Sequence, residues 1–152
     1  DDPAAEPGNS RQSRNPPKRP DQNAQTPDTQ TMDQLHINGI RAYGYTGALP
    51  EENVLGQWFE VDLTLWLDLS VAGTSDVLAD THNYVRLVQQ VQTLIQTETF
   101  QLIERMADAI ATQSLASDPR IEQIRVQLTK PNPPIPNFDG CIVVDITRQR
   151  SR

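Results

Sequence analysis

The chain has 152 residues, which is enough for one domain of average size and too few for two full ones. Its 20 acidic residues exceed its 13 lysines and arginines, for a net charge of −7, and this argues against nucleic acid as the main partner because phosphate binding needs clustered positive charge. A single cysteine excludes an internal disulfide and a multi-cysteine zinc site, and no apolar run approaches the roughly 20 residues that span a bilayer.

Residues 1–31 form a proline-rich tail. They hold six of the 12 prolines and no Val, Ile, Leu, Met, Phe, Trp, Tyr or Cys, so they have nothing to bury in an apolar core. The basic stretch 14–20 is compatible with a localisation signal or a ligand for a proline-binding module, but a solvated linker explains it more simply. We therefore predict a disordered tail over 1–31 and a folded domain over 32–152. Because the chain also starts without the apolar core of a secretion signal, we expect a cytoplasmic protein.

Two strands open the predicted domain. The first covers residues 35–45, where Gly39 predicts a bulge or a close backbone approach. The second covers residues 57–70 and alternates with period two. Its apolar face consists of Phe59, Val61, Leu63, Leu65, Leu67 and Leu69. The opposite face is polar except for Trp58 and Trp66, so we expect it to be partly exposed to solvent or to contact another subunit.

Two helices follow a connection over residues 71–81. The first is predicted over 83–97, where Tyr84, Leu87, Val88, Val91, Leu94 and Ile95 recur at spacings of three and four. The second is predicted over 100–116, with a stripe of Leu102, Ile103, Met106, Ile110 and Leu115. Asp118 and Pro119 end it.

The domain closes with two more strands, over residues 121–129 and 141–147. Between them, four of the seven residues 130–136 are prolines, which cannot continue a hydrogen-bonded ladder. Two hairpins joined by two helices predict an α+β fold in the order ββααββ, with a four-stranded antiparallel sheet and both helices on one face.

Such a sheet leaves two edge strands unpaired, and its tryptophan-bearing face is uncovered. In a monomer both features are aggregation hazards. Joining the sheets of neighbouring subunits into a barrel pairs the edges and covers the face. We therefore expect a homo-oligomer.

Several short motifs follow one another between about residues 33 and 148. They are residues 39–48 (GIRAYGYTGA), 52–57 (ENVLGQ), 61–63 (VDL), 80–84 (DTHNY), 102–104 (LIE) and 129–136 (TKPNPPIP). In this order and spacing they resemble the dihydroneopterin aldolase family. The resemblance implies the tunnelling fold (T-fold), in which subunits pool their sheets into a barrel. It further implies a ring of four subunits, typically two stacked rings, and active sites between subunits.

The resemblance also implies an activity, which is a lyase step of folate biosynthesis. 7,8-Dihydroneopterin is cleaved to 6-hydroxymethyl-7,8-dihydropterin and glycolaldehyde, and relatives often epimerise C2′ to give dihydromonapterin. The N5=C6 imine of the substrate takes the electrons released by bond cleavage. We therefore expect no cofactor, no metal ion and no Schiff-base lysine, and a small pterin as the partner rather than nucleic acid or a membrane.

Two alternatives stay open. One is a dihydroneopterin triphosphate epimerase, which must hold three phosphates; only Arg41, Arg86 and Arg105 are basic candidates near the motifs. The other is a non-catalytic pterin-binding protein of the same fold, which would have no need of a catalytic lysine.

The resemblance assigns roles to Glu104 and Lys130. Glu104 would anchor the pterin, because a carboxylate can accept two parallel hydrogen bonds from the 2-amino group and N3–H. Lys130 would be the catalytic base or proton shuttle, although a free lysine with a pKa near 10.4 is a poor base at neutral pH. Without the resemblance, Glu104 would be a solvated acid that pairs with Arg105, and Lys130 an ordinary residue at the end of a strand. Lys130 is, however, the only lysine of the domain.

Further roles follow from the same resemblance. Tyr84 would relay protons near the reacting side chain, and Glu52 would lie near the substrate hydroxyls. Backbone groups would help to hold the ring at Thr81, His82, Asn83 and Ile103. Glu104 and Lys130 would come from one subunit and the segment around Tyr84 from its neighbour. No metal site is expected, since two histidines and one cysteine at these spacings match no zinc motif.

Overall fold

The computed structural model describes residues 32–151, so the predicted tail over 1–31 lies outside the described residues. Nine elements follow in chain order. They are β1 (Gln34–Gly44), α1 (Pro50–Leu55), β2 (Gln57–Trp66), α2 (Ser70–Ser75), the 3-10 helix η1 (Leu78–Asp80), α3 (Tyr84–Thr97), α4 (Ile103–Ser117), β3 (Gln123–Lys130) and β4 (Ile142–Gln149). None of the described helices is both long and apolar enough to cross a membrane.

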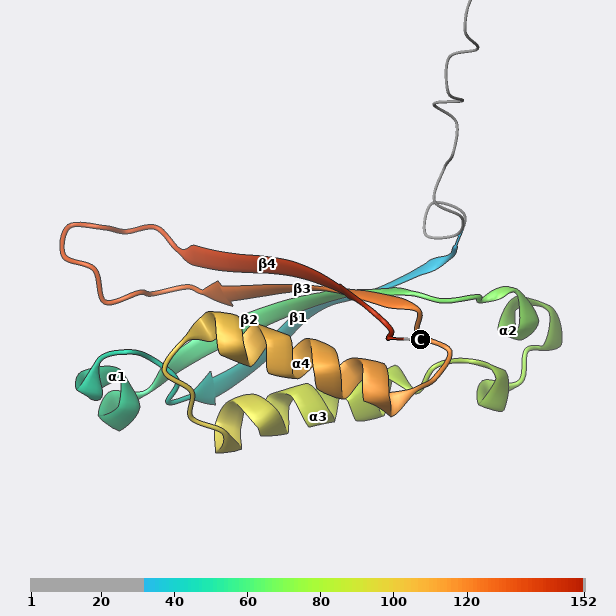
Figure 1. Cartoon of the computed structure of the whole chain (residues 1–152), viewed down its shortest axis with the longest axis horizontal. Coiled ribbons are helices and arrows are strands. Elements are labelled where there is room, and N and C mark those ends of the chain that lie inside the picture. Colours follow the sequence, from blue (N-terminus) through green and yellow to red (C-terminus); the bar gives the residue numbers. More distant parts are fainter. Residues whose placement is uncertain (1–31, 152) are drawn as a thin grey trace, which may run out of the picture.

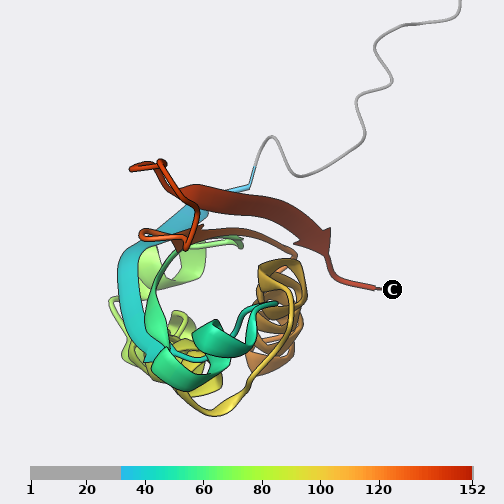
Figure 2. The same ribbon diagram turned by 90° about the vertical axis from the view of Figure 1, so that its left-hand side faces the viewer.

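The four strands form one antiparallel sheet in the order β1-β2-β3-β4 (Figure 1). The helices α3 and α4 lie together on one face, with α3 against β1 and α4 against β3 and β4. Figure 2 shows the sheet curving around this helix pair. The predicted α+β fold with both helices on one side is confirmed.

The core lies between the sheet and the two long helices. The apolar face of β2 fills it from one side, since Phe59, Val61, Leu63 and Leu65 are fully buried. The helices fill it from the other side with Leu87, Val91 and Ile95 of α3 and Met106, Ala107, Ile110 and Ala111 of α4. Each large apolar side chain buried in this way stabilises the fold by about 1.5–3 kcal/mol.

The expected bulge in β1 is present. Gly39 has a φ of 79°, and the pairing of β1 with β2 shifts between Ile37 and Ile40. Glycine adopts this left-handed conformation without the steric penalty of a side chain. The Gly39 N–H leaves the ladder and donates to Asp62 Oδ1 at 2.8 Å.

The connections contain more structure than the sequence predicts. The loop over 46–56 includes α1, and the connection over 71–81 includes α2 and η1. Helices of six residues or fewer are too short to show an apolar stripe, so hydrophobic periodicity does not indicate them. The second long helix also begins at Ile103 rather than at residue 100, and Leu102 is exposed instead of joining its stripe.

The sheet face turned away from the helices is uncovered in the single chain. Trp58 is 42% exposed there, between the Tyr43 ring at 5.4 Å and the Arg41 guanidinium at 4.1 Å. Ile142 and Val143 are exposed on the edge strand β4. A face of this kind suits contact with further copies, and the barrel of several sheets stays a prediction.

Candidate functional site

Lys130 and Glu52 form an ion pair at the end of β3. The Lys130 ammonium donates to Glu52 Oε2 at 2.8 Å, and Gln57 Nε2 donates to the same oxygen at 2.7 Å. The other oxygen, Oε1, accepts from the Leu49 N–H at 3.3 Å, which ties the carboxylate to the start of α1. The two charged side chains are only 13% and 8% exposed. The ammonium is therefore held in one place by a carboxylate that is itself fixed.

The surroundings of Glu52 decide its charge. Burial raises the pKa of this carboxyl, but hydrogen bonds from Lys130, Gln57 and the Leu49 N–H outweigh burial. The net result is a pKa below the ordinary value. Glu52 is thus ionised at neutral pH, and the contact with Lys130 is a charged pair.

Glu104 lies in the first turn of α4, at the end of the domain where β3 finishes (Figure 1). The positive end of the helix dipole favours a carboxylate at this position. The expected competitor, Arg105, turns instead to Asp108 at 3.8 Å. Within residues 32–151 no side chain pairs with the Glu104 carboxylate, which is exposed and free to accept hydrogen bonds. Ile103, the preceding residue, is buried in the core.

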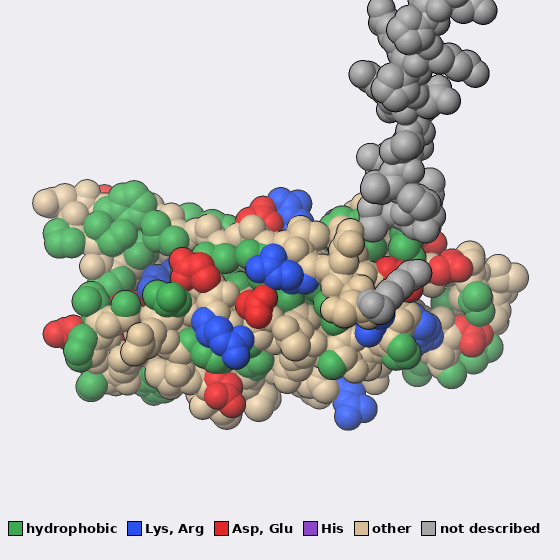
Figure 3. All heavy atoms as spheres, viewed as in Figure 1, with side chains coloured by type: hydrophobic (Ala, Val, Ile, Leu, Met, Phe, Trp, Pro, Cys, Tyr) green, Lys and Arg blue, Asp and Glu red, His purple; other side chains and the backbone are tan. Residues whose placement is uncertain are grey.

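Hydrophobic side chains gather at this same end of the molecule (Figure 3). They come from α1, from the residue before it and from the proline-rich β3–β4 loop, and the exposed ones are Leu49, Val54, Leu55, Ile135 and Phe138. Apolar surroundings next to Lys130 and Glu104 suit the flat face of a heterocycle.

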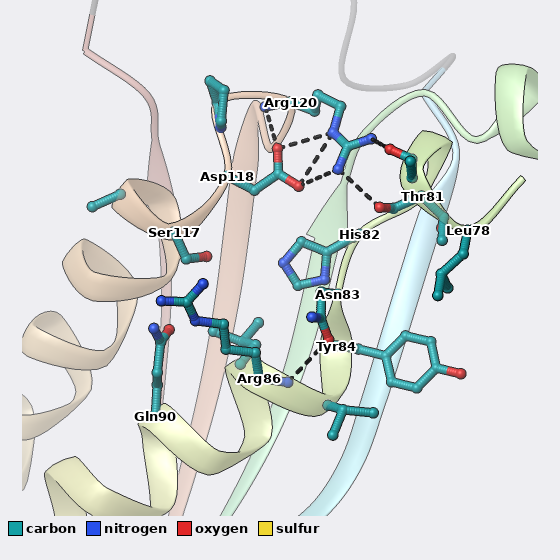
Figure 4. A pocket seen from close by; sticks show the side chains of 15 residues that line it. Leu78, Thr81, His82, Asn83, Tyr84, Arg86, Gln90, Ser117, Asp118 and Arg120 are labelled. Carbon is teal, nitrogen blue, oxygen red and sulfur yellow. Dashed lines mark hydrogen bonds and ion pairs between the residues drawn. The ribbon is translucent and has the colours of Figure 1, made fainter.

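The remaining predicted site residues lie at the start of α3. Asn83 is the N-cap of this helix, and its Oδ1 accepts from the Arg86 N–H at 3.2 Å. Tyr84 is the first helical residue and is 51% exposed, so it is not the core tyrosine that its spacing allowed. A pocket lies beside this segment, between the start of α3 and the end of α4 (Figure 4). Thr81, His82, Asn83 and Tyr84 are among the residues that line it.

His82 is buried in this pocket, with 3% of its surface exposed. Its Nδ1 has no hydrogen-bond partner in the described part of the chain. Burial lowers the pKa of His82. The Asp118 charge raises it, and the Arg120 charge lowers it further. Because the net pKa lies below the usual histidine value of about 6.5, the ring is neutral at pH 7.

This burial predicts a pH dependence of stability. Between the lowered pKa of folded His82 and about 6.5 the unfolded chain binds more protons, so stability rises with pH in that window and falls on acidification. We expect the free energy of unfolding of the unmutated chain to drop as the pH is lowered through about 6.5. Denaturant titrations of His82→Asn should lack this component. His36→Asn, which removes the exposed histidine of β1, should keep it; an identical drop in His82→Asn would contradict the assignment.

The predicted site residues therefore fall into two groups. Glu52, Lys130, Ile103 and Glu104 lie at one end of the domain, whereas the segment 81–84 lies at the other (Figure 1). The 14 residues of α3 separate the two ends by about 21 Å at 1.5 Å per residue. A single chain does not bring the two groups together.

Residues 35–147, nearly the whole folded domain, match the sequence profile of the family described as dihydroneopterin aldolase. The chain belongs to the dihydroneopterin aldolase family. An aldolase is a lyase, so family membership also assigns the enzyme class.

Individual relatives agree with the family. A Synechocystis protein named "Probable dihydroneopterin aldolase" is 52% identical over 119 residues, which cover 78% of this chain and 100% of that protein. The dihydroneopterin aldolase of Bacillus subtilis is 41% identical over 120 residues, 79% of this chain and all of that one. The crystal structure of the E. coli dihydroneopterin aldolase in complex with neopterin superimposes with a TM-score of 0.71 at 26% identity, and covers 77% of this chain and 99% of that one.

Two features of this dihydroneopterin aldolase family member were not predicted as functional. Gln57 belongs to a motif that carries the resemblance, yet only the folded chain shows that it holds the Glu52 carboxylate. Arg120 contacts the backbone of the segment before α3, and no sequence signal indicated it. In the described range 32–151, no cluster of three or more His, Cys, Asp or Glu side chains is arranged to hold a metal ion.

Proposed function

We propose that this chain is a 7,8-dihydroneopterin aldolase that releases 6-hydroxymethyl-7,8-dihydropterin and glycolaldehyde. The observation that carries the proposal is the Lys130 ammonium, held 2.8 Å from Glu52 at the end where the Glu104 carboxylate has no partner among residues 32–151. Similarity over the whole length of two relatives, one named dihydroneopterin aldolase and the other probable dihydroneopterin aldolase, supports it. So does the likeness to a structure that holds neopterin.

The chemistry that we propose uses these groups in sequence. Glu104 accepts hydrogen bonds from the 2-amino group and N3–H of the pterin and places the side chain of the substrate near Lys130. The C2′ hydroxyl loses its proton and becomes the aldehyde of glycolaldehyde as the C1′–C2′ bond breaks. The bonding electrons move into the N5=C6 imine, and N5 gains a proton, which leaves an enamine with a C6=C1′ double bond. C1′ is then protonated and N5 loses its proton, so that the N5=C6 imine forms again in the hydroxymethyl product. The ring of the substrate thus replaces both a metal ion and a protein Schiff base.

The ion pair with Glu52 bears on the part played by Lys130. An ammonium has no free lone pair, so we propose that it orients a bound water that takes the C2′ proton, and that it stabilises the negative charge developing on that oxygen. Tyr84 would pass protons between this water and C1′, since a phenol both donates and accepts.

We further propose that the site forms between subunits of a homo-oligomer. Lys130 and Tyr84 lie at opposite ends of one chain, so both can act on one substrate only if they come from two copies. The exposed sheet face provides a surface for such contacts, and so do the outer edges of β1 and β4, which have no neighbouring strand in the described part of the chain.

A mixing experiment tests the two-subunit site. Lys130→Ala and Tyr84→Phe should each be nearly inactive alone, but co-refolded subunits should regain roughly a quarter of the unmutated activity, because random head-to-tail pairing joins an intact lysine end to an intact tyrosine end in that share of interfaces. Glycolaldehyde release is the measurement. The matched control mixes Lys130→Ala with Glu104→Ala, whose defects share one end, and mixing should give no gain over the two variants alone. Mixed oligomers of normal size without recovered activity would contradict a shared site.

The two alternatives give different outcomes in the same assay. A triphosphate epimerase needs free cations. Arg41 contacts Trp58 and Glu60, and Arg105 contacts Asp108, which leaves Arg86 of α3 as the third candidate. Product from the triphosphate alone would favour that alternative, and no product from either substrate would leave a non-catalytic pterin-binding protein. Dihydromonapterin among the products would show that the same site also epimerises C2′. In that case C1′ attacks the other face of the glycolaldehyde carbonyl when the C1′–C2′ bond forms again.

A further inference from the structure

Arg120 joins the turn after α4 to the segment before α3. Its guanidinium contacts both oxygens of the Asp118 carboxylate, from Nε to Oδ1 at 3.0 Å and from Nη2 to Oδ2 at 2.7 Å. The same Nη2 donates to the main-chain oxygen of Thr81 at 2.8 Å, and Nη1 donates to that of Ala79 at 3.4 Å. Figure 4 shows the guanidinium between Asp118 and Thr81, above the His82 ring. One side chain thus ties residues 79–81 to the body of the domain.

Asp118, which holds the Arg120 guanidinium, is itself fixed in place. The Asp118 side chain is 9% exposed, and Oδ1 also accepts from the Arg120 N–H at 2.9 Å. Hydrogen bonds from Arg120 lower the pKa of Asp118 and outweigh its burial, so the carboxylate stays charged at neutral pH. A planar guanidinium can serve a carboxylate and two carbonyl groups at once, which a lysine ammonium at the same distance cannot do.

The segment that Arg120 holds has mainly local contacts of its own. Ser75 Oγ donates to Asp80 Oδ2 at 2.6 Å, and the Thr81 N–H donates to the Leu78 carbonyl at 3.2 Å. These bonds shape the segment without fixing it to the sheet or to α4. Tyr84 follows after His82 and Asn83 as the first residue of α3, is half exposed, and its hydroxyl has no hydrogen-bond partner among the described residues. The position of its ring therefore depends on the start of α3 and on the backbone that leads into it.

We propose that Arg120 is a positioning residue for the reaction, and that it sets the place of the Tyr84 hydroxyl by holding the carbonyl groups of Ala79 and Thr81. This inference rests on the proposed function, because the relay role of Tyr84 does. A displacement of about 1 Å in a reacting group lowers rates by as much as about 100-fold. Loss of Arg120 acts on that distance and leaves the Lys130 and Glu104 end untouched.

The first test is the rate of Arg120→Gln in the full-length oligomer. We expect kcat for dihydroneopterin cleavage to fall by about 10- to 100-fold, with a smaller change in KM. Arg120→Lys should show a similar loss and replaces Arg120→Gln if that variant does not fold. The matched control is Arg148→Gln, because Arg148 contacts Asp108 at 3.1 Å with similar exposure but ties β4 to α4. An unmutated kcat in both Arg120 variants would overturn the proposal.

The second test asks whether Arg120 acts through Tyr84. In the Tyr84→Phe background, Arg120→Gln should lower kcat by less than about threefold, because the hydroxyl that Arg120 positions is already gone. If the fold-decrease in kcat of the double variant equals the product of the two single decreases, the proposal is overturned. If the unmutated chain does not cleave dihydroneopterin, the proposed function fails, and hydrogen exchange of the amides of residues 78–84 then decides the holding role. Faster exchange in Arg120→Gln than in Arg148→Gln supports it, and equal exchange overturns it.

Discussion

Lys130→Ala is expected to lower kcat on 7,8-dihydroneopterin by about 100- to 10,000-fold, the range typical of losing a proton-transfer group. Binding of a pterin should persist, because Glu104 supplies the main polar contact to the ring. Stopped-flow or coupled measurement of glycolaldehyde gives the rate, and fluorescence titration with a pterin gives the affinity. A turnover near that of the unmutated chain would remove Lys130 from the mechanism.

The buried partner of Lys130 requires a control. Lys130→Ala leaves the Glu52 carboxylate inside without its cation, which costs about 3–5 kcal/mol when such a pair is fully buried. The double variant Lys130→Met with Glu52→Gln removes both charges and should recover stability without recovering turnover. Lys130→Arg keeps a cation but not the geometry of a primary ammonium, and should stay far below the unmutated rate. Recovery of activity in the double variant would show that only the fold depended on this pair.

Glu104→Ala is expected to weaken pterin binding by at least about 100-fold, because it removes two charge-assisted hydrogen bonds worth about 1.5 kcal/mol or more each. Since Glu104 is exposed and unpaired within the described range, its loss should leave the melting temperature nearly unchanged. Equilibrium titration with neopterin measures the effect.

A matched control for Glu104 lies on the same helix. Asp108, one turn later, makes only exposed ion pairs with Arg105 and Arg148, so Asp108→Ala should bind neopterin like the unmutated chain. Glu104→Gln keeps one acceptor and loses the charge, and should fall between Glu104→Ala and the unmutated chain. Equal affinities for Glu104→Ala and Asp108→Ala would mean that the pterin is anchored elsewhere.

The fold could be predicted from the sequence where periodicity was strong. In β2 every second residue is apolar over a long run, and burial of that face follows directly. The stripe of α3 places Leu87, Val91 and Ile95 in the core in the same way. Leu102 fits the stripe of α4 by spacing but precedes the helix, so it is exposed. Spacing alone does not show where a helix begins when no Ser, Thr, Asp or Asn caps it.

The contacts of the site are less visible in the sequence. Glu52 and Lys130 are 78 positions apart, and their pairing depends on α1, a helix too short to have a pattern. Arg120 reaches Ala79 across 41 positions. Such contacts depend on how the sheet and the helices pack, so sequence motifs could name candidate residues but not the hydrogen bonds that hold them.

The two ends of the domain carry different halves of the proposed site, and this bears on how many subunits an active particle needs. An open row of subunits joined end to end has one complete site fewer than it has subunits, with an unmatched lysine end and an unmatched tyrosine end. A closed ring has one complete site for every subunit. The rotation between neighbours decides whether the row closes, so the same angle that sets the symmetry of the particle also sets its catalytic yield per chain.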